Sequence, residues 1–238
     1  MTPTVVLLHG FTHTGASWDP VVSALGERYR ALAIDIRGHG SASGREPVAL
    51  EGVLEDLAAV APGRFTLVGY SMGGRIALHA ALALPERIER LVLIGASPGI
   101  ADPAEREARL RDDERLAGEI ESMSIEAFAH RWAQTPVLAG QPPDVLAAAH
   151  ADRLRNRPAG LAAALRGLGN AALPSLWERL GEIRTRVALV VGERDEKFRA
   201  IADQMAAGLP AAEVIVAPGA GHAVHLEAPA RVASVIVL

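Results

Sequence analysis

The stretch "FTLVGYSMGGR" at residues 65–75 joins a short apolar run to a glycine-rich segment that holds a single serine. The apolar run predicts a buried strand, and the apolar residues 72–85 that follow predict a helix. Residues 69–73, "GYSMG", fit the G-x-S-x-G pattern of a nucleophile elbow, in which serine occupies a sharp strand-to-helix turn. Such a turn strains the backbone at Ser71, so its neighbours have to be small. The plainer alternative is a glycine-rich turn whose serine only caps the helix.

Further apolar runs recur on both sides of this stretch. They cover residues 4–9, 31–35, 90–95, 187–193 and 213–217. Nearly continuous apolar character over such short runs is typical of strands that are buried on both faces of a parallel sheet. The segments between several of these runs have helical spacing, and we expect helices at residues 47–60, 72–85 and 197–210. Alternation of strands and helices predicts an α/β fold with a doubly wound, mostly parallel sheet.

Residues 98–170 interrupt this alternation, because they contain several helical patterns and no strand pattern. A helical insertion between two strands can cover the carboxyl ends of the strands, which is the edge where ligands bind in open α/β sheets. We therefore divide the chain into a core, residues 1–97 and 171–238, and a helical lid, residues 98–170.

The composition excludes several classes of function. The chain has 238 residues, a formal net charge of −4, 50 % hydrophobic residues and no cysteine. Absence of cysteine excludes thiolate catalysis, disulfides and cysteine-ligated zinc. Without a basic patch, binding to nucleic acid or an anionic membrane is not expected. The N-terminal apolar run is too short for a signal peptide or a membrane span, so we expect a soluble cytoplasmic protein. No carboxylate cluster indicates a metal, we expect no cofactor, and the oligomeric state is not readable.

A serine is a weak nucleophile or base unless a histidine, itself oriented by a carboxylate, lies beside it. Asp195 is the favoured carboxylate because it lies in the loop just past a predicted strand, whereas Glu193 lies on the strand end. His222 is the favoured histidine because Gly-Ala-Gly precedes it and lets the backbone approach the site. The competing His225 lies where a final helix is expected to begin.

Two backbone N–H groups are candidates for an oxyanion hole. One belongs to Met72, at the start of the helix that follows the serine, and the other to Phe11, in the loop after the first predicted strand. Such donors stabilise negative charge that develops during a reaction. His9 and His39 lie in loops at the same sheet edge, and we expect them to order those loops rather than to react.

The elbow, followed by the aspartate and then the histidine, resembles the α/β-hydrolase superfamily over essentially the whole chain. This superfamily includes esterases, lactonases and lyases, so the fold alone does not give the substrate. The segments "GYSMGGRIA", "RWAQTPVLA", "RLRNRPAGLAAALRGLG", "GERDEKFRAIA" and "GAGHAVHLEAPA" further resemble one family of menaquinone-pathway enzymes, the 2-succinyl-6-hydroxy-2,4-cyclohexadiene-1-carboxylate synthases. These enzymes are lyases that eliminate pyruvate from 2-succinyl-5-enolpyruvyl-6-hydroxy-3-cyclohexene-1-carboxylate. The resemblance implies a Ser71–His222–Asp195 triad in which the serine is the general base.

The resemblance also implies a small-molecule substrate with several carboxylates, which planar guanidinium groups bind well. It places substrate contacts at five positions: Tyr70, Arg75, Arg109, Trp132 and Arg155. Arg75 lies one helical turn after Ser71, which suits an anchor for an acidic substrate. Ala133 departs from the family pattern, which often has an aromatic residue there. For any single arginine the plainer alternative is a solvated helix face with i,i+4 ion pairs.

Two other classes of function remain open at this stage. A serine hydrolase would use the same triad to attack a small ester, a lactone or a C–C bond in an acidic substrate, through an acyl-enzyme. A signalling receptor or inactive scaffold could also use this fold, although the complete triad argues against a loss of activity.

Overall fold

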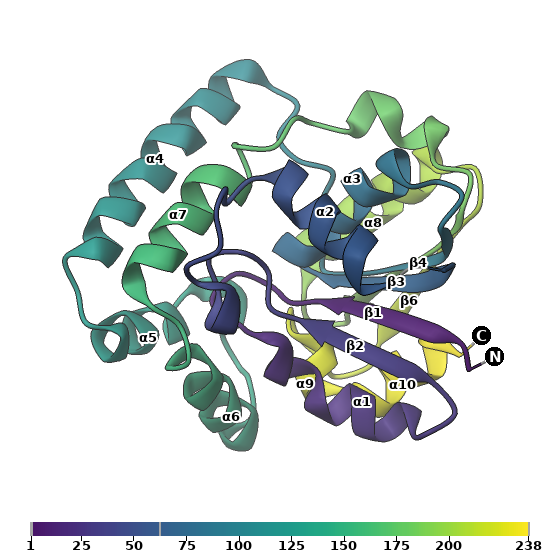
Figure 1. Ribbon diagram of the computed structural model, residues 1–238, viewed down its shortest axis with the longest axis horizontal. Helices are drawn as coiled ribbons and strands as arrows, with labels where there is room; N and C mark the ends of the chain where they lie inside the picture. The colour runs from purple at the N-terminus through teal and green to yellow at the C-terminus, as the bar shows by residue number, and fades with distance from the viewer. Residues whose placement is uncertain (1, 62, 238) are drawn as a thin grey trace.

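A computed structural model describes residues 2–61 and 63–237 of the chain. Its centre is a six-stranded sheet in the order β2-β1-β3-β4-β5-β6, and every neighbouring pair is parallel (Figure 1). The strands are β1 (Thr4–Leu8), β2 (Arg30–Ile34), β3 (Phe65–Tyr70), β4 (Ile88–Ile94), β5 (Arg186–Gly192) and β6 (Ala212–Ala217). All six predicted strands are confirmed, and so is the doubly wound parallel α/β fold.

Helices cover both faces of the sheet, and each face has its own apolar core (Figure 1). One face packs against α2 (Leu50–Val60), α3 (Met72–Ala83) and α8 (Glu196–Gly208). The other packs against α1 (Asp19–Leu25), α9 (Val224–Glu227) and α10 (Pro229–Ile236). The predicted helices are confirmed. The helix α2 begins at Leu50 rather than at residue 47, because the backbone of Ala49 is still extended.

The burial of the strands depends on their place in the sheet. The central strands β3 and β4 are almost entirely buried, which explains their nearly continuous apolar sequences. The edge strands β2 and β6 are partly exposed, because each has a neighbouring strand on one side only.

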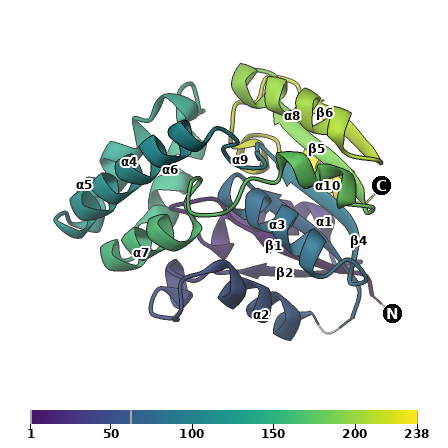
Figure 2. The same cartoon turned by 90° about the horizontal axis from the view of Figure 1, so that it is seen from above.

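The insertion between β4 and β5 is helical, as predicted, and no strand occurs among its residues 98–170, all of which the structure describes. Figure 2 shows its helices gathered to one side of the sheet. They are α4 (Pro103–Glu121), α5 (Ile125–Ala133), α6 (Pro143–Arg153) and α7 (Pro158–Leu168). A small apolar core of their own includes Ile120, Phe128 and Leu161. Where the lid ends and the core begins, at residues 98 and 170, stays a prediction.

Short 3-10 helices complete the fold at η1 (Gly15–Trp18), η2 (Gly40–Ala42), η3 (Pro136–Leu138) and η4 (Trp177–Glu182). Within residues 2–61 and 63–237, no helix combines the length and the apolar character that crossing a membrane requires.

The start of α3 lies directly against the carboxyl end of β1. A methyl group on Gly73 would collide with the carbonyl oxygens of Leu8 and His9, so only glycine allows this approach. A methyl group on Gly69 would in turn collide with the backbone of Gly73. The glycines around Ser71 therefore have a packing reason as well as a conformational one.

We expect Gly73→Ala to lower the free energy of unfolding by at least about 2 kcal/mol, since backbone atoms would have to move to admit the methyl group. Gly118→Ala is the matched control, because Gly118 lies exposed in α4 with no atom near the added carbon. The control should raise stability by about 0.5–1 kcal/mol. Urea unfolding of both variants measures this, and equal effects would contradict the packing argument.

Candidate active site

Ser71 lies between β3 and α3 in a strained conformation, with φ 50° and ψ −108°. A positive φ is uncommon for any residue other than glycine and is often found at functional sites. The Ser71 N–H donates to the carbonyl oxygen of Ile94 at 2.8 Å, and the Ser71 carbonyl accepts from the N–H of Arg75 at 3.1 Å. These two bonds hold the turn, so the elbow geometry expected from residues 69–73 is present.

The structure brings Ser71, His222 and Asp195 together from three separate loops. The Nε2 of His222 lies 3.3 Å from Ser71 Oγ, and its Nδ1 lies 2.7 Å from Asp195 Oδ2. An ionised carboxylate can only accept, so Nδ1 carries the proton and Nε2 of the neutral ring is left to accept from the serine. Gly95, with φ 52°, makes room for the ring, because an added carbon there would lie 2.8 Å from His222 Cε1.

The competing residues have other surroundings. His225 is fully buried, and its ring centroid lies 4.9 Å from that of Trp18 and 4.2 Å from that of Tyr70. Burial lowers the pKa of His225 well below its ordinary value. Glu193 accepts from the N–H of Gly219 at 2.8 Å. The geometry therefore favours His222 and Asp195.

The two candidate oxyanion donors belong to adjoining segments. Met72 is the first residue of α3, where N–H groups have no partner within the helix and the helix dipole is positive. Phe11 follows β1, and its ring centroid lies 5.1 Å from that of Trp132 in the lid. Their role as an oxyanion hole stays a prediction.

His9 and His39 order the loops beside the site, as predicted. The Nε2 of His9 accepts from the N–H of Ile36 at 2.9 Å, so Nδ1 carries the proton and donates to the Gly10 carbonyl at 2.9 Å. Burial lowers the pKa of His9 to about 4, which keeps the ring neutral. The Nε2 of His39 accepts from the N–H of Thr12 at 3.4 Å.

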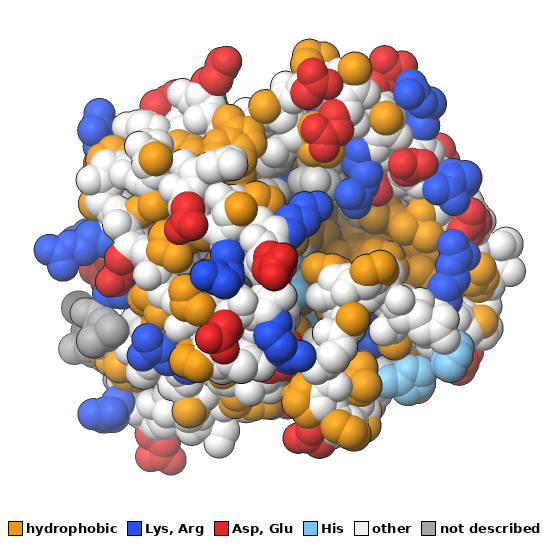
Figure 3. All heavy atoms as spheres, turned by 180° about the vertical axis from the view of Figure 1, so that it is seen from behind, with side chains coloured by type: hydrophobic (Ala, Val, Ile, Leu, Met, Phe, Trp, Pro, Cys, Tyr) orange, Lys and Arg blue, Asp and Glu red, His pale blue; other side chains and the backbone are white. Residues whose placement is uncertain are grey.

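A cavity of about 240 Å³ adjoins Ser71 and His222. Its lining comprises Ser71, Arg75, Gly95, Ser97, Arg109, Val137, Asn170, Lys197, Phe198 and His222. Three of these described lining residues are cations, and none is a carboxylate. The face drawn in Figure 3 is hollowed beside several Lys or Arg side chains, with hydrophobic side chains at the bottom of the hollow. The cavity is therefore suited to an anion.

Arg75 is the most deeply buried of these three cations, with 7 % of its surface exposed. Its Nη1 donates to Asn170 Oδ1, and it takes part in none of the ion pairs among the described residues. Burial, together with the charge of Arg109, lowers the pKa of Arg75 to about 10, so the side chain remains a cation at neutral pH. Sequence reasoning missed Asn170, which no motif marks.

Of the other predicted substrate contacts, Arg109 lines this cavity, whereas Trp132 and Tyr70 are not among its lining residues. Arg109 reaches from α4 and donates through Nε to Asp113 Oδ1 at 2.7 Å. It also lines an adjoining hollow of about 340 Å³ together with Trp132. Tyr70 is buried with its ring centroid 5.3 Å from that of His222, and burial raises the pKa of its hydroxyl.

Arg155, which was also predicted to contact the substrate, does not line the cavity beside Ser71, and its role stays a prediction. Its side chain is 64 % exposed and lines a separate, larger hollow of about 670 Å³ that also includes Asp35 and Arg45. That hollow contains neither Ser71 nor any histidine. Its larger size does not make it the reaction site, because its lining includes no serine paired with a histidine.

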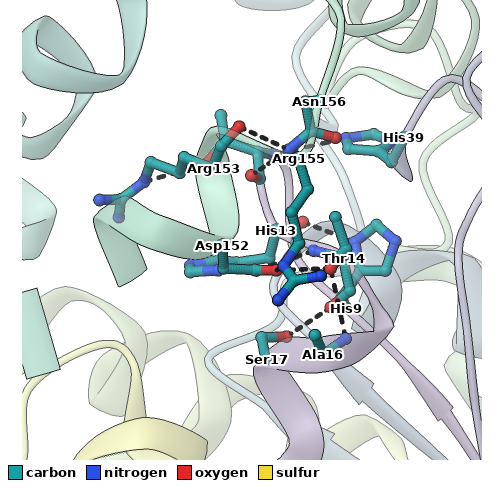
Figure 4. A network of polar contacts seen from close by, with 12 residues as sticks. His9, His13, Thr14, Ala16, Ser17, His39, Asp152, Arg153, Arg155 and Asn156 are labelled. Atoms are coloured by element: carbon teal, nitrogen blue, oxygen red, sulfur yellow. Dashed lines mark hydrogen bonds and ion pairs between the residues drawn. The ribbon is translucent and has the colours of Figure 1, made fainter. Parts of the chain in front are cut away.

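Arg153 takes the inward position instead. It is 1 % exposed, donates through Nε to Thr12 Oγ1 at 3.3 Å and lies near Tyr70. Neither Nη1 nor Nη2 has a hydrogen-bond partner among the described residues. Figure 4 shows Arg153 and Arg155 extending in different directions. Residues two apart near a helix end are separated by about 200° around the axis, which explains the difference. A periodic signal in the sequence could have identified Arg153. This signal is the buried face of α6, which comprises Val145, Ala149, Asp152 and Arg153.

The end of α6 is also fastened to the core, a feature that no motif predicted (Figure 4). Asp152 accepts from the Thr14 N–H at 2.9 Å, from the Thr14 hydroxyl and from His13 Nδ1 at 3.0 Å. Asn156 donates to the Thr12 carbonyl at 2.7 Å and accepts from the Gly40 N–H at 3.0 Å. These bonds hold the loop that contains Phe11, in which Thr12 has a φ of 72°.

Comparisons with known proteins agree with the fold described above. The model of the "Alpha/beta hydrolase family" matches residues 5–235. A relative from Bacillus subtilis (strain 168), which provisionally carries the name 2-succinyl-6-hydroxy-2,4-cyclohexadiene-1-carboxylate synthase, is 38 % identical over 94 % of this chain and 85 % of its own. The synthase of that name from Escherichia coli O1:K1 / APEC is 34 % identical over 97 % and 90 %. The structure of MenH from S. aureus matches with a TM-score of 0.93 and 30 % identity, covering 100 % of this chain and 92 % of that one.

We expect Asp152→Asn to lower the free energy of unfolding near neutral pH by about 2 kcal/mol. Burial would raise the pKa of Asp152, but hydrogen bonds from His13 and Thr14 outweigh it and hold the pKa below its ordinary value. A lowered pKa in the folded state means that the carboxylate stabilises fully above the unfolded pKa of about 3.9. The stabilisation is lost as the pH falls from there through the folded value.

Urea unfolding of the wild type and Asp152→Asn across this acidic range measures the effect. The difference between the two should be constant above about pH 5 and should shrink below about pH 4. Asp144→Asn, at an exposed position of the same helix, is the control and should change little. A difference that does not depend on pH would contradict the assignment.

Proposed function

The chain belongs to the alpha/beta hydrolase family, and we propose that within it the protein is a carbon–oxygen lyase of menaquinone biosynthesis. Its reaction is elimination of pyruvate from 2-succinyl-5-enolpyruvyl-6-hydroxy-3-cyclohexene-1-carboxylate, which gives 2-succinyl-6-hydroxy-2,4-cyclohexadiene-1-carboxylate. The observation that carries the proposal is the buried Arg75 beside Ser71, in a cavity with two further cations and no carboxylate among the described lining residues. The relatives named as this synthase support the same reading.

The charges of the cavity suit this substrate. A buried guanidinium without an ion-pair partner is costly, and a bound carboxylate offsets that cost. The substrate carries carboxylates on its ring, succinyl and enolpyruvyl groups. Planar guanidinium groups bind such carboxylates through two parallel hydrogen bonds. An uncharged ester would leave Arg75 with Asn170 but without a charged partner, so the cavity favours an acidic substrate over a neutral one.

The reaction is an elimination across the ring double bond. The C–H electrons at ring C2 form the C2=C3 bond, and the C3=C4 pair moves to C4=C5. The bond between C5 and the enolpyruvyl oxygen breaks, so the leaving group is the enolate of pyruvate, which then takes a proton. No water, oxidant or cofactor enters this balance.

Each residue of the site has a role in this scheme. Ser71, with its hydroxyl hydrogen-bonded to His222, removes the C2 proton, and His222 accepts the proton from the serine. Asp195 holds the tautomer of His222 and stabilises the imidazolium. The N–H groups of Phe11 and Met72 face the charge that spreads onto the succinyl carbonyl, and a donor in such a place contributes about 3 kcal/mol. Arg75 holds a carboxylate so that the C–H points at Ser71.

A serine hydrolase of an acidic ester or lactone is the second candidate, because the same triad geometry serves nucleophilic attack. The two candidates differ in what they do with the enolpyruvyl substrate. The lyase releases pyruvate and forms a conjugated diene, whereas the hydrolase leaves the C5–oxygen bond intact and adds water to a carbonyl elsewhere.

We expect the wild type to release pyruvate from the enolpyruvyl substrate, made in situ, well above the uncatalysed rate. Ser71→Ala should lower kcat by at least about 10³-fold, since the base is removed. A coupled pyruvate assay with an enzyme-free blank measures this. No acceleration over the blank, together with turnover of simple esters, would contradict the lyase and favour the hydrolase.

We also expect substitutions of Arg153 and Arg155, which serve as a matched pair, to differ in their effect on kcat/KM. Arg153→Met should lower kcat/KM by about 10–100-fold, because its buried guanidinium lies near Tyr70, the residue before Ser71, and holds the Thr12 hydroxyl in the loop of Phe11. Arg155→Met, at an exposed position, should stay within about twofold of the wild type. Steady-state kinetics with urea midpoints to check folding test the pair, and equal effects would contradict the inward role of Arg153.

A further inference from the structure

The chain contains 24 basic residues, of which only Lys197 is a lysine. This lysine lines the cavity beside Ser71 and His222. From this placement we propose that Lys197 is a specificity-determining residue that binds a carboxylate of the substrate at the mouth of the cavity. The inference rests on the proposed function. It deepens that function by adding Lys197, a residue of the core helix α8, as a third cationic contact for the substrate.

The position of Lys197 is tied to the candidate triad by a single helix. Asp195 caps the N-terminus of α8 by accepting from the Phe198 N–H at 3.4 Å, and Lys197 is the second residue of that helix. The Nζ of Lys197 lies 5.9 Å from the centroid of the Phe198 ring. That ring lies 4.5 Å from the ring of His222, measured between centroids. The ammonium group of Lys197 therefore lies beside the Phe198 ring, which packs against His222.

The dipole of α8 gives no reason for a cation in the first turn of that helix. The first turn of a helix favours acidic residues, since the helix dipole is positive there. Lys197 takes part in none of the ion pairs that the described residues form. A lysine that breaks this preference with a long contact to the Phe198 ring, and without an ion pair, points to a functional demand. Here the demand is an anion in the cavity.

The three cations approach the cavity from different parts of the fold. Arg75 comes from the core helix α3 and is buried, whereas Arg109 comes from the lid helix α4 and is partly exposed. Lys197 comes from α8 and is exposed. Three cations in this arrangement match the three carboxylates of the proposed substrate. A compact ammonium on a flexible stem suits the outermost contact, where a carboxylate enters and leaves.

Arg199 serves as the matched control. It lies two residues further along α8, is also exposed and does not line the cavity. Its Nη1 donates to the carbonyl oxygen of Glu193 at 3.3 Å. Replacing either residue removes one positive charge from the same turn of α8, so the comparison separates a contact in the cavity from a general effect of charge.

We expect Lys197→Met to raise KM for the enolpyruvyl substrate by about tenfold, with kcat within about threefold of the wild type. Arg199→Met should leave both parameters nearly unchanged, and Lys197→Arg should recover most of the loss. The KM ratio of Lys197→Met to wild type should fall as salt is added, because an exposed charge contact is screened. Equal KM values for Lys197→Met and Arg199→Met in an enzyme that releases pyruvate would overturn the inference alone.

A second test does not depend on lyase activity. Pyridoxal 5′-phosphate is an anionic aldehyde that forms an imine with a lysine amine, and sodium borohydride then reduces the C=N bond to a stable amine. Besides the α-amino group, Lys197 is the only amine that can react in this way. We expect saturable labelling of Lys197, mapped by peptide mass spectrometry, that citrate suppresses and Arg75→Met weakens.

Labelling of Lys197 that citrate does not affect would overturn the inference, since an exposed amine outside an anion site reacts in the same way. Protected labelling in a protein that releases no pyruvate would support the anion contact while contradicting the proposed reaction. The failure of one proposal is thereby distinguishable from the failure of the other.

Discussion

The site depends on one steric constraint, the close approach of the start of α3 to the carboxyl end of β1. Gly73 lies against the carbonyls of Leu8 and His9, and this contact sets where Ser71 leaves the strand with its strained backbone. The same approach brings the N–H of Met72 beside the loop that contains Phe11. Gly95 has a matching role on the next strand, because its missing side chain leaves room for His222. Glycine positions in the sheet edge therefore determine the geometry of the candidate triad.

Electrostatics around this scaffold select for anions. The buried Arg75 is one helical turn from Ser71, and the lid supplies Arg109 to the same cavity. The lid is fastened to the core by Asp152 and Asn156, which bind the loop after β1. The segment that places Arg153 near Tyr70 thus also holds the loop of Phe11, whose N–H is a proposed oxyanion donor.

Sequence alone predicted the features that are local. The strands and the elbow at Ser71 were predictable because apolar runs and glycine spacing act over a few residues. The order Ser71, Asp195, His222 was readable because each residue follows a strand that ends at the same sheet edge. The burial of Arg153 and the exposure of Arg155 were not readable, because a basic residue at a helix end can face either way until the packing of α6 is known. Asn170 and Asn156 escaped notice because their hydrogen bonds join residues far apart in the chain.

The central claim is that Ser71 acts as a base which removes a ring proton, not as a nucleophile. The most direct test is single-turnover pyruvate release from the enolpyruvyl substrate that carries deuterium at ring C2, compared with the undeuterated compound. The account predicts a clearly slower release from the deuterated substrate, because breaking the C2–H bond begins the elimination. Equal rates of release, with accumulation of an acyl group on Ser71, would contradict it.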